Sequence, residues 1–171
     1  MKGERTQWYI ASPGAVVVCA DRRDDTDISG TFWTLYSEKG QAFSNYTELV
    51  YGMEELFDDI RFPFPSTSER TFAGEAEHRA YNIDYERERV MSDEKLLQKH
   101  GSIGTFIVRV QHRQNSSWQG RITWMEEDQT VQFRSTWELI KLIESALDAV
   151  SEPEETQEAS PAWEIVPEDE E

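Results

Sequence analysis

The chain matches itself at an offset of 90 residues. Residues 14–57 align without a gap on residues 104–147. The identities at this offset include Gly14/Gly104, Val18/Val108, Arg23/Arg113, Gly30/Gly120, Phe43/Phe133, Glu48/Glu138, Leu49/Leu139 and Glu54/Glu144. A fixed offset with a shared order of turn, strand and helix signals indicates a repeated supersecondary unit. We therefore predict one domain over residues 1–150, made of unit one (14–60), a connector (61–103) and unit two (104–150), and followed by a tail (151–171).

Each unit has the pattern of three strands and a helix. In unit two, Phe106, Val108 and Val110 alternate with more polar neighbours, as in a half-buried strand. Ser135 and Glu138 form a capping box, and one helical stripe follows it: Leu139, Ile140, Ile143, Ala146, Leu147 and Val150. Unit one repeats the arrangement with Asn45 and Glu48 at the cap and a stripe of Leu49, Val50, Met53, Phe57 and Ile60. We expect both stripes to form core.

These elements predict an α+β fold in which a duplicated β-β-β-α unit packs an antiparallel sheet on two amphipathic helices. The sequence leaves open whether the strands of the two units join edge to edge or stack as two sheets. In the connector, residues 84–99 are rich in Glu, Arg and Leu and end near Gly101, which predicts an additional charged helix. Residues 151–171 hold nine acids and no base and predict a disordered acidic tail.

Acids outnumber bases by 34 to 17, which gives a formal net charge of −17. Such a charge repels nucleic acid and anionic lipid from most of the surface and excludes a polycation role. The longest apolar run, Ala15–Ala20, is far shorter than the roughly 20 residues that cross a bilayer. Residues 1–12 lack an apolar signal core. We therefore expect a cytoplasmic protein with no membrane partner.

The densest polar group surrounds the first turn of unit two, within residues 104–125, which contain no acid. Its members are Arg109, His112, Arg113, Asn115, Ser117, Trp118, Gln119 and Arg121. Arginine binds phosphate or carboxylate through paired hydrogen bonds, and an indole offers a stacking surface. These residues are therefore candidates for binding nucleic acid or a nucleotide phosphate. The alternative is an ordinary hairpin, in which Asn115 and Ser117 shape the turn, Trp118 lies in the core and the arginines pair with connector glutamates.

Two short resemblances involve unit two. Arg109-x-x-x-Arg113 and Asn115-x-Ser117-x-x-Gly120 resemble the two signatures of PilZ domains, which bind cyclic di-GMP. In that family the two motifs stand well apart, whereas here they abut, so we do not carry the ligand over. The segments Trp118-Gln119-Gly120, Phe133-Arg134-Ser135 and 138–143 are similar to small uncharacterised acidic proteins of gut Firmicutes. That resemblance implies a bacterial cytosolic protein and no particular activity.

Motifs of known enzyme classes are missing from the sequence. His78, His100 and His112 have no partner at metal-ligand spacing, and Cys19 is the one cysteine. The sequence contains no phosphate-binding loop, no dinucleotide fingerprint and no nucleophile-elbow motif. We therefore expect a protein that is not an enzyme, with no catalytic residue, no cofactor and no metal.

Two acidic features are further binding candidates. The predicted helix of unit one carries a row of carboxylates that can imitate nucleic-acid phosphates toward a basic partner, or that forms a solvated face: Glu48, Glu54, Glu55, Asp58 and Asp59. In the tail, Trp163 stands with Ile165 and Val166 among acids. This composition is typical of a short linear motif that docks in a groove or adds a strand, and an inert solubilising tail is the alternative.

The sequence therefore favours a non-enzymatic interaction protein, an acidic adaptor or inhibitor that binds a basic, nucleic-acid-handling bacterial protein. The alternative is a nucleic-acid or nucleotide-phosphate binding module that uses the basic strands of unit two, with the acidic tail as autoinhibitor.

Overall fold

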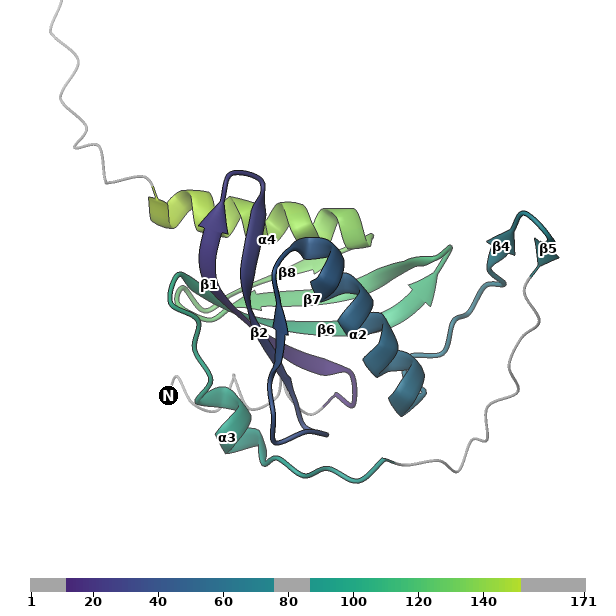
Figure 1. Cartoon of the computed structure of the whole chain (residues 1–171), viewed down its shortest axis with the longest axis horizontal. Coiled ribbons are helices and arrows are strands. Elements are labelled where there is room, and N and C mark those ends of the chain that lie inside the picture. Colours follow the sequence, from purple (N-terminus) through teal and green to yellow (C-terminus); the bar gives the residue numbers. More distant parts are fainter. Residues whose placement is uncertain (1–11, 76–86, 152–171) are drawn as a thin grey trace, which may run out of the picture.

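A six-stranded antiparallel sheet and two long helices form the body of the protein, as a computed structural model shows for residues 12–75 and 87–151 (Figure 1). The strand order is β3-β2-β1-β6-β7-β8. Unit one supplies β1 (Ala15–Asp24), β2 (Asp27–Thr34), β3 (Gln41–Phe43) and α2 (Tyr46–Ile60). Unit two supplies β6 (Gly104–Gln114), β7 (Ser117–Trp124), β8 (Gln129–Phe133) and α4 (Thr136–Ser151). The predicted α+β class with an antiparallel sheet is confirmed.

The strands of the two units join edge to edge, through β1 and β6. Val17 lies opposite Ile107 in this antiparallel pair. Because residue 107 is the equivalent of residue 17 at the offset of 90, this pair maps onto itself, and an approximate twofold axis passes between the two strands. All six residues of the apolar run Ala15–Ala20 are buried, so both faces of this central strand are covered. A continuous apolar run, rather than an alternating one, is what such a strand requires.

The backbone irregularities of the two units also fall at equivalent positions. The register of β1 with β2 shifts at Asp21, and that of β6 with β7 shifts at Gln111. A Cβ atom on Gly30 would lie 1.9 Å from the Cys19 carbonyl oxygen. A Cβ atom on Gly120 would lie 2.0 Å from the Arg109 carbonyl oxygen. Glycine is therefore required at both positions because the neighbouring strand approaches too closely for any side chain.

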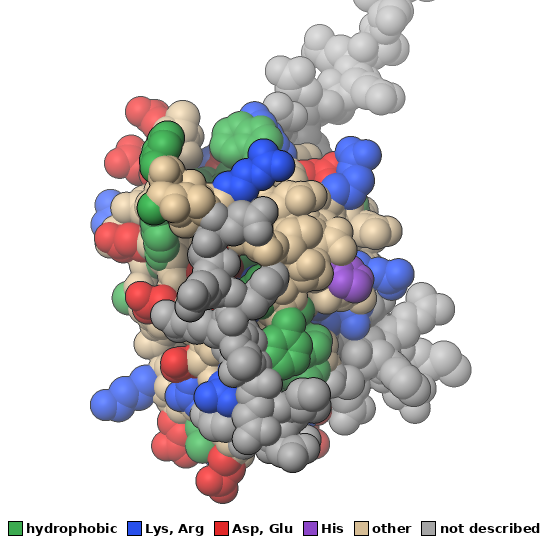
Figure 2. All heavy atoms as spheres, turned by 90° about the vertical axis from the view of Figure 1, so that its right-hand side faces the viewer, with side chains coloured by type: hydrophobic (Ala, Val, Ile, Leu, Met, Phe, Trp, Pro, Cys, Tyr) green, Lys and Arg blue, Asp and Glu red, His purple; other side chains and the backbone are tan. Residues whose placement is uncertain are grey.

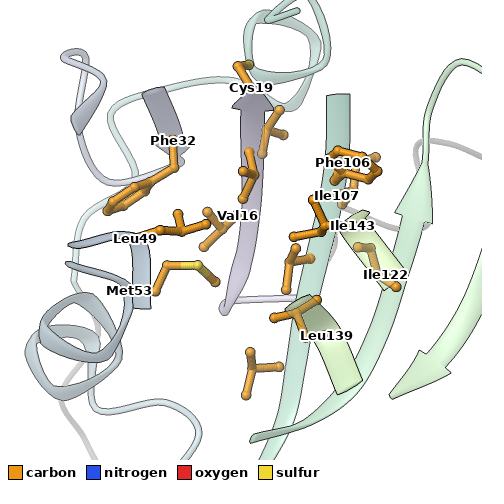
Figure 3. Packing of buried hydrophobic residues seen from close by; sticks show 14 of the residues in the cluster. Val16, Cys19, Phe32, Leu49, Met53, Phe106, Ile107, Ile122, Leu139 and Ile143 are labelled. Atoms are coloured by element: carbon orange, nitrogen blue, oxygen red, sulfur yellow. The ribbon is translucent and has the colours of Figure 1, made fainter. Parts of the chain in front are cut away.

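Both long helices cover the same face of the sheet. Val18 on β1 lies directly opposite Phe32 on β2 and Phe106 on β6, so these three side chains point to one face. On that face Phe32 lies with Leu49 of α2, and Phe106 lies with the apolar side chains of α4 (Figure 3). The capped helix starts are confirmed, since the Asn45 and Ser135 side chains accept from the amides of Glu48 and Glu138. The predicted stripes also lie in the core or against it, apart from Val150, which is exposed.

The connector contains a small hairpin of β4 (Arg70–Thr71) and β5 (Gly74–Glu75) and the short helix α3 (Asp93–Leu97). The predicted connector helix over residues 84–99 is wrong in its start, and residues 84–86 lie outside the described ranges. The amides of Val90 and Met91 both donate to the Leu35 carbonyl, which holds this backbone outside a helix. The helix begins only after Ser92, whose hydroxyl caps it. In the described ranges, no helix is both long enough and apolar enough to span a membrane.

Candidate functional site

Arg113 lies inside the protein, between unit two and the helix of unit one. Its side chain is 4% exposed. Its Nη1 atom contacts Glu54 Oε1 at 2.9 Å and Asp58 Oδ1 at 2.8 Å, both on α2. Its Nε atom donates to the Pro63 carbonyl at 2.7 Å, and its Nη2 atom has no partner among the described residues. The predicted pairing of arginine with acid is therefore present for Arg113, but the acids come from α2 and not from the connector.

Trp118 joins the same internal cluster. Its ring packs edge-on against Phe57 of α2, with the centroids 5.4 Å apart, and it is buried. Its Nε1 atom donates to Glu54 Oε2, so the Glu54 carboxylate accepts hydrogen bonds from both the Trp118 indole and the Arg113 guanidinium. The Arg113 guanidinium stands 5.9 Å from the Phe57 ring centroid. A cation, two carboxylates and two aromatic rings thus fasten α2 to the second half of the sheet.

A matching cluster fastens α4 to the first half of the sheet. Arg23 on β1 contacts Glu144 and Asp148 on α4, each at 2.7 Å. Tyr46 at the start of α2 donates its hydroxyl to Glu144. Burial, and then this bond to a carboxylate, raise the pKa of the Tyr46 phenol, while hydrogen bonds to Asp148 and Glu144 raise the pKa of Arg23. Each unit therefore holds the helix of the other through an arginine and an acid pair at equivalent positions.

This geometry corrects the reading of Arg113 and Trp118 as a phosphate and base-stacking pair. Both side chains are buried, and Nε and Nη1 of Arg113 and Nε1 of Trp118 already donate to protein acceptors. Glu54 and Asp58 are likewise turned toward Arg113, although their side chains are partly exposed. A buried charge needs partners of opposite charge, and Glu54 and Asp58 are those partners for Arg113. Together with Trp118, these residues form a packing contact between the two units.

Three basic side chains of unit two lie elsewhere. Arg109 on β6 is directly opposite Arg121 on β7, and both lie on the sheet face that points away from the helices. His112 and Arg121 are exposed, and Arg109 is half-buried. Gln119 lies opposite His112 and exchanges hydrogen bonds with the backbone of Gln114. This group, Arg109, His112 and Arg121, is what remains of the predicted basic surface.

The turn residues have local roles. Asn115 and Ser116 both have positive φ angles, 55° and 52°, as a two-residue hairpin turn requires. The Asn115 amide donates to the Thr67 hydroxyl of the connector. Ser117 accepts from the amide of Thr136, the first residue of α4. In these two residues the structure agrees with the simpler reading of the sequence, in which polar side chains shape a turn.

The outer face of α2 carries a solvent-facing stripe that we call the acidic stripe: Glu48, Tyr51, Glu55 and Asp59. Tyr51 is 69% exposed in the middle of this stripe and is not among the residues predicted from the sequence. Glu48 accepts from the Ser44 amide, and Asp59 contacts Arg87 of the connector at 2.9 Å. The stripe runs at intervals of three and four residues, which places all four side chains on one side of the helix.

Other predicted residues stand apart from these clusters. Trp163 lies outside the described residues. Cys19 is buried, and this burial raises the pKa of its thiol to about 12. Within residues 12–75 and 87–151, no group of three or more His, Cys, Asp and Glu side chains is placed to hold a metal ion.

The contacts of Arg23 with Glu144 and Asp148 are not among the sequence predictions, although the sequence contains a signal for them. Arg23 and Arg113 are identical at the offset, and so are Glu54 and Glu144. An arginine on a strand and an acid pair on a helix, both repeated at one offset, indicate a repeated contact between those elements.

Comparison of the chain with models of protein families, with curated proteins and with solved structures found no match. The similarity to acidic proteins of gut Firmicutes therefore stays a prediction.

Proposed function

We propose that the chain is a non-enzymatic interaction protein of the bacterial cytoplasm, an adaptor or inhibitor that binds a basic, nucleic-acid-handling protein through the acidic stripe of α2. The observation that carries this proposal is the exposed ring of Tyr51 between Glu48 and Glu55. A large aromatic side chain in water on a rigid helix is free to contact a partner, and its flanking carboxylates define the partner's charge.

The stripe has the chemistry to hold arginine or lysine side chains. A cation placed over a tyrosine ring gains about 0.5–1 kcal/mol at an exposed site. A carboxylate beside that ring can bind the same guanidinium through charge-assisted hydrogen bonds. Carboxylates held in a fixed row by a helix also resemble the phosphates that a nucleic-acid-binding surface normally contacts. A basic protein that recognises phosphates is therefore the partner class that this stripe fits.

The test is quantitative capture of bacterial proteins on the immobilised full chain. The test variant is Tyr51→Ala/Glu55→Lys, and the control is Trp137→Ala, which removes an exposed aromatic residue from α4 instead. We expect one or a few basic proteins to be retained by the original chain and the control, to be lost with the test variant, and to be released by added duplex DNA. The same set of proteins on all three chains, or release by salt alone with no effect of DNA, would contradict the proposal.

A second candidate function is nucleic-acid or nucleotide-phosphate binding by Arg109, His112 and Arg121. The observation in its favour is that His112 and Arg121 are exposed on the sheet face that points away from the helices, where Arg121 lies directly opposite Arg109. On the face that Figure 2 shows, the described Lys and Arg side chains are scattered among acidic and uncharged ones. In this alternative the acidic tail would act as autoinhibitor.

Titration of labelled single- and double-stranded oligonucleotides with the full chain distinguishes the two functions. Nucleic-acid binding should weaken steeply with salt and be lost in Arg121→Glu, while Lys141→Glu, an equal change of charge on α4, should leave it intact. Absence of binding at low salt, both by the full chain and by a variant that ends at Ser151 and lacks the proposed autoinhibitor, would reject nucleic-acid binding by these residues and leave the first function untouched.

A further inference from the structure

Two grooves lie at equivalent places in the two units, each between the helix and the outer strands of its own half. The groove beside α2 has a volume of about 220 Å³, and the groove beside α4 has a volume of about 350 Å³. Equivalent positions at the offset of 90 line both of them, including Thr34 and Trp124, and Gln41 and Val131. The comparison of the two linings shows where the units differ.

The groove beside α2 is charged. Glu55 and Asp59 stand on its helix side, with Lys39 opposite. Arg87, from the connector that follows α2 in the chain, also lines this groove and contacts Asp59. The chain therefore brings a later segment of opposite charge back onto the groove of unit one.

The groove beside α4 is apolar and contains no charged residue. The equivalents of Glu55 and Asp59 are Ser145 and Ala149, so both acids are absent. Its other lining residues include Ile122, Trp124, Val131, Leu142 and Ala146. Val131 is exposed, although it is apolar. Such a surface favours an occupant with apolar side chains, and it lacks the carboxylates that would repel an acidic one.

Two unused hydrogen-bonding features border this groove. The Trp124 Nε1 atom is buried and has no acceptor among the described residues. β8 is the last strand of the sheet, and no described strand pairs with its outer edge. A buried donor without an acceptor is costly, and an open strand edge is a template for another strand. An extended peptide beside β8 would pair with this open edge, and its carbonyl groups are acceptors of the kind that the Trp124 indole lacks.

We propose that the tail of the same chain, through residues 162–166, docks in the groove beside α4 as a strand added to β8. Trp163 and Ile165 alternate with Glu164, so an extended backbone places the two apolar side chains on one side and the carboxylate on the other. The groove of unit two contains no equivalent of the carboxylates of Glu55 and Asp59 that line the groove of unit one, so the nine acids of residues 151–171 meet no like charge in its lining.

The length of the tail permits this docking. α4 ends at Ser151, two residues beyond Ala149 on the groove wall. Eleven residues, 152–162, separate Ser151 from Trp163 and span up to roughly 36 Å when extended, whereas α4 is about 24 Å long. A tethered segment has an effective concentration of about millimolar, so even a weak contact is populated. The proposal does not depend on the basic partner, because it uses the opposite unit and a different surface.

The experiment is a spin-label measurement on the full chain in solution. Glu168→Cys introduces one reactive thiol, since Cys19 is buried and does not compete for the label. We expect the label to broaden the NMR signals of the Val131 amide and the Trp124 indole N–H, and to leave the equivalent amides of Gln41 and Thr34 sharp. In addition, Trp163→Ala in the unlabelled chain should shift the indole signal of Trp124, because the docked strand is released and with it the backbone carbonyl that accepts from the indole.

Variants at exposed positions of α4 test the docking without changing a buried residue. Ser145→Glu/Ala149→Glu restores the two acids of unit one at exposed helix positions and should abolish the broadening. Val150→Glu, an exposed neighbour outside the groove, is the control and should retain it. The proposal is overturned if Trp163→Ala leaves the broadening unchanged, or if broadening appears only between separately labelled chains, which would make a second copy the occupant.

Discussion

Replacement of Arg113 by methionine should destabilise the fold by about 3 kcal/mol. Removal of one partner of a buried ion pair costs roughly 3–5 kcal/mol, since the opposite charge is left without compensation. We expect the lower end, because the side chains of Glu54 and Asp58 are 35% and 48% exposed and can be hydrated again. Methionine keeps an apolar stem beside Phe57. The lost free energy of unfolding therefore measures the charged contacts of Arg113 and not the creation of a cavity.

The equivalent change at Arg23 provides an internal comparison. Arg23 is 22% exposed and Asp148 is 63% exposed, so solvent screens this pair, and Arg23→Met should cost about 1 kcal/mol. Urea unfolding of both variants, with the slope of the transition checked for constancy, measures the two losses. The expected difference is about 2 kcal/mol. Equal losses, or a larger loss for Arg23→Met, would refute the claim that burial of the Arg113 cluster sets its contribution to stability.

Three further changes test the fold. Gly120→Ala should lower the free energy of unfolding by about 1–3 kcal/mol, since the new methyl group collides with the Arg109 carbonyl; thermal unfolding measures it, and an unchanged midpoint would contradict the close approach. Burial raises the pKa of Cys19 to about 12, so its thiol stabilises the fold below the unfolded pKa of about 9 and loses that contribution as pH rises toward 12. Stability of Cys19→Ala should therefore fall less between pH 8 and 11 than that of the original chain, and an identical slope would be inconsistent with the raised pKa. Ser92→Ala removes the cap of α3 and should cost about 1 kcal/mol in urea unfolding, and no loss would mean that the cap does not hold this helix.

Much of the fold could be predicted from the sequence because it depends on local signals. The capping residues Asn45 and Ser135 mark the helix starts, and the apolar stripes behind them identify the buried faces. The edge-to-edge junction was left open, although the run Ala15–Ala20 carried a signal for it. A strand that is apolar at every position needs cover on both faces and neighbours on both edges, and only a central position provides these.

The site was harder to predict because its residue types do not reveal their partners. Arg113, Trp118 and Glu54 have the composition of a ligand-binding surface, yet the fold turns all three toward one another. Long-range pairing of this kind depends on how the helix of one unit lies over the strands of the other, which periodicity within each unit does not contain. The grooves escaped notice for the same reason, since their walls combine strand and helix residues far apart in the sequence.

The twofold arrangement within one chain has a consequence for how its surfaces can change. In a dimer of identical subunits, every substitution is made twice, so a change that suits one groove is imposed on the other. Here each half is encoded separately, so Ser145 and Ala149 stand on one side at the positions that Glu55 and Asp59 occupy on the other. The ion pairs of Arg113 and Arg23 that hold the two halves together can stay the same while the outer surfaces of the halves come to bind different ligands.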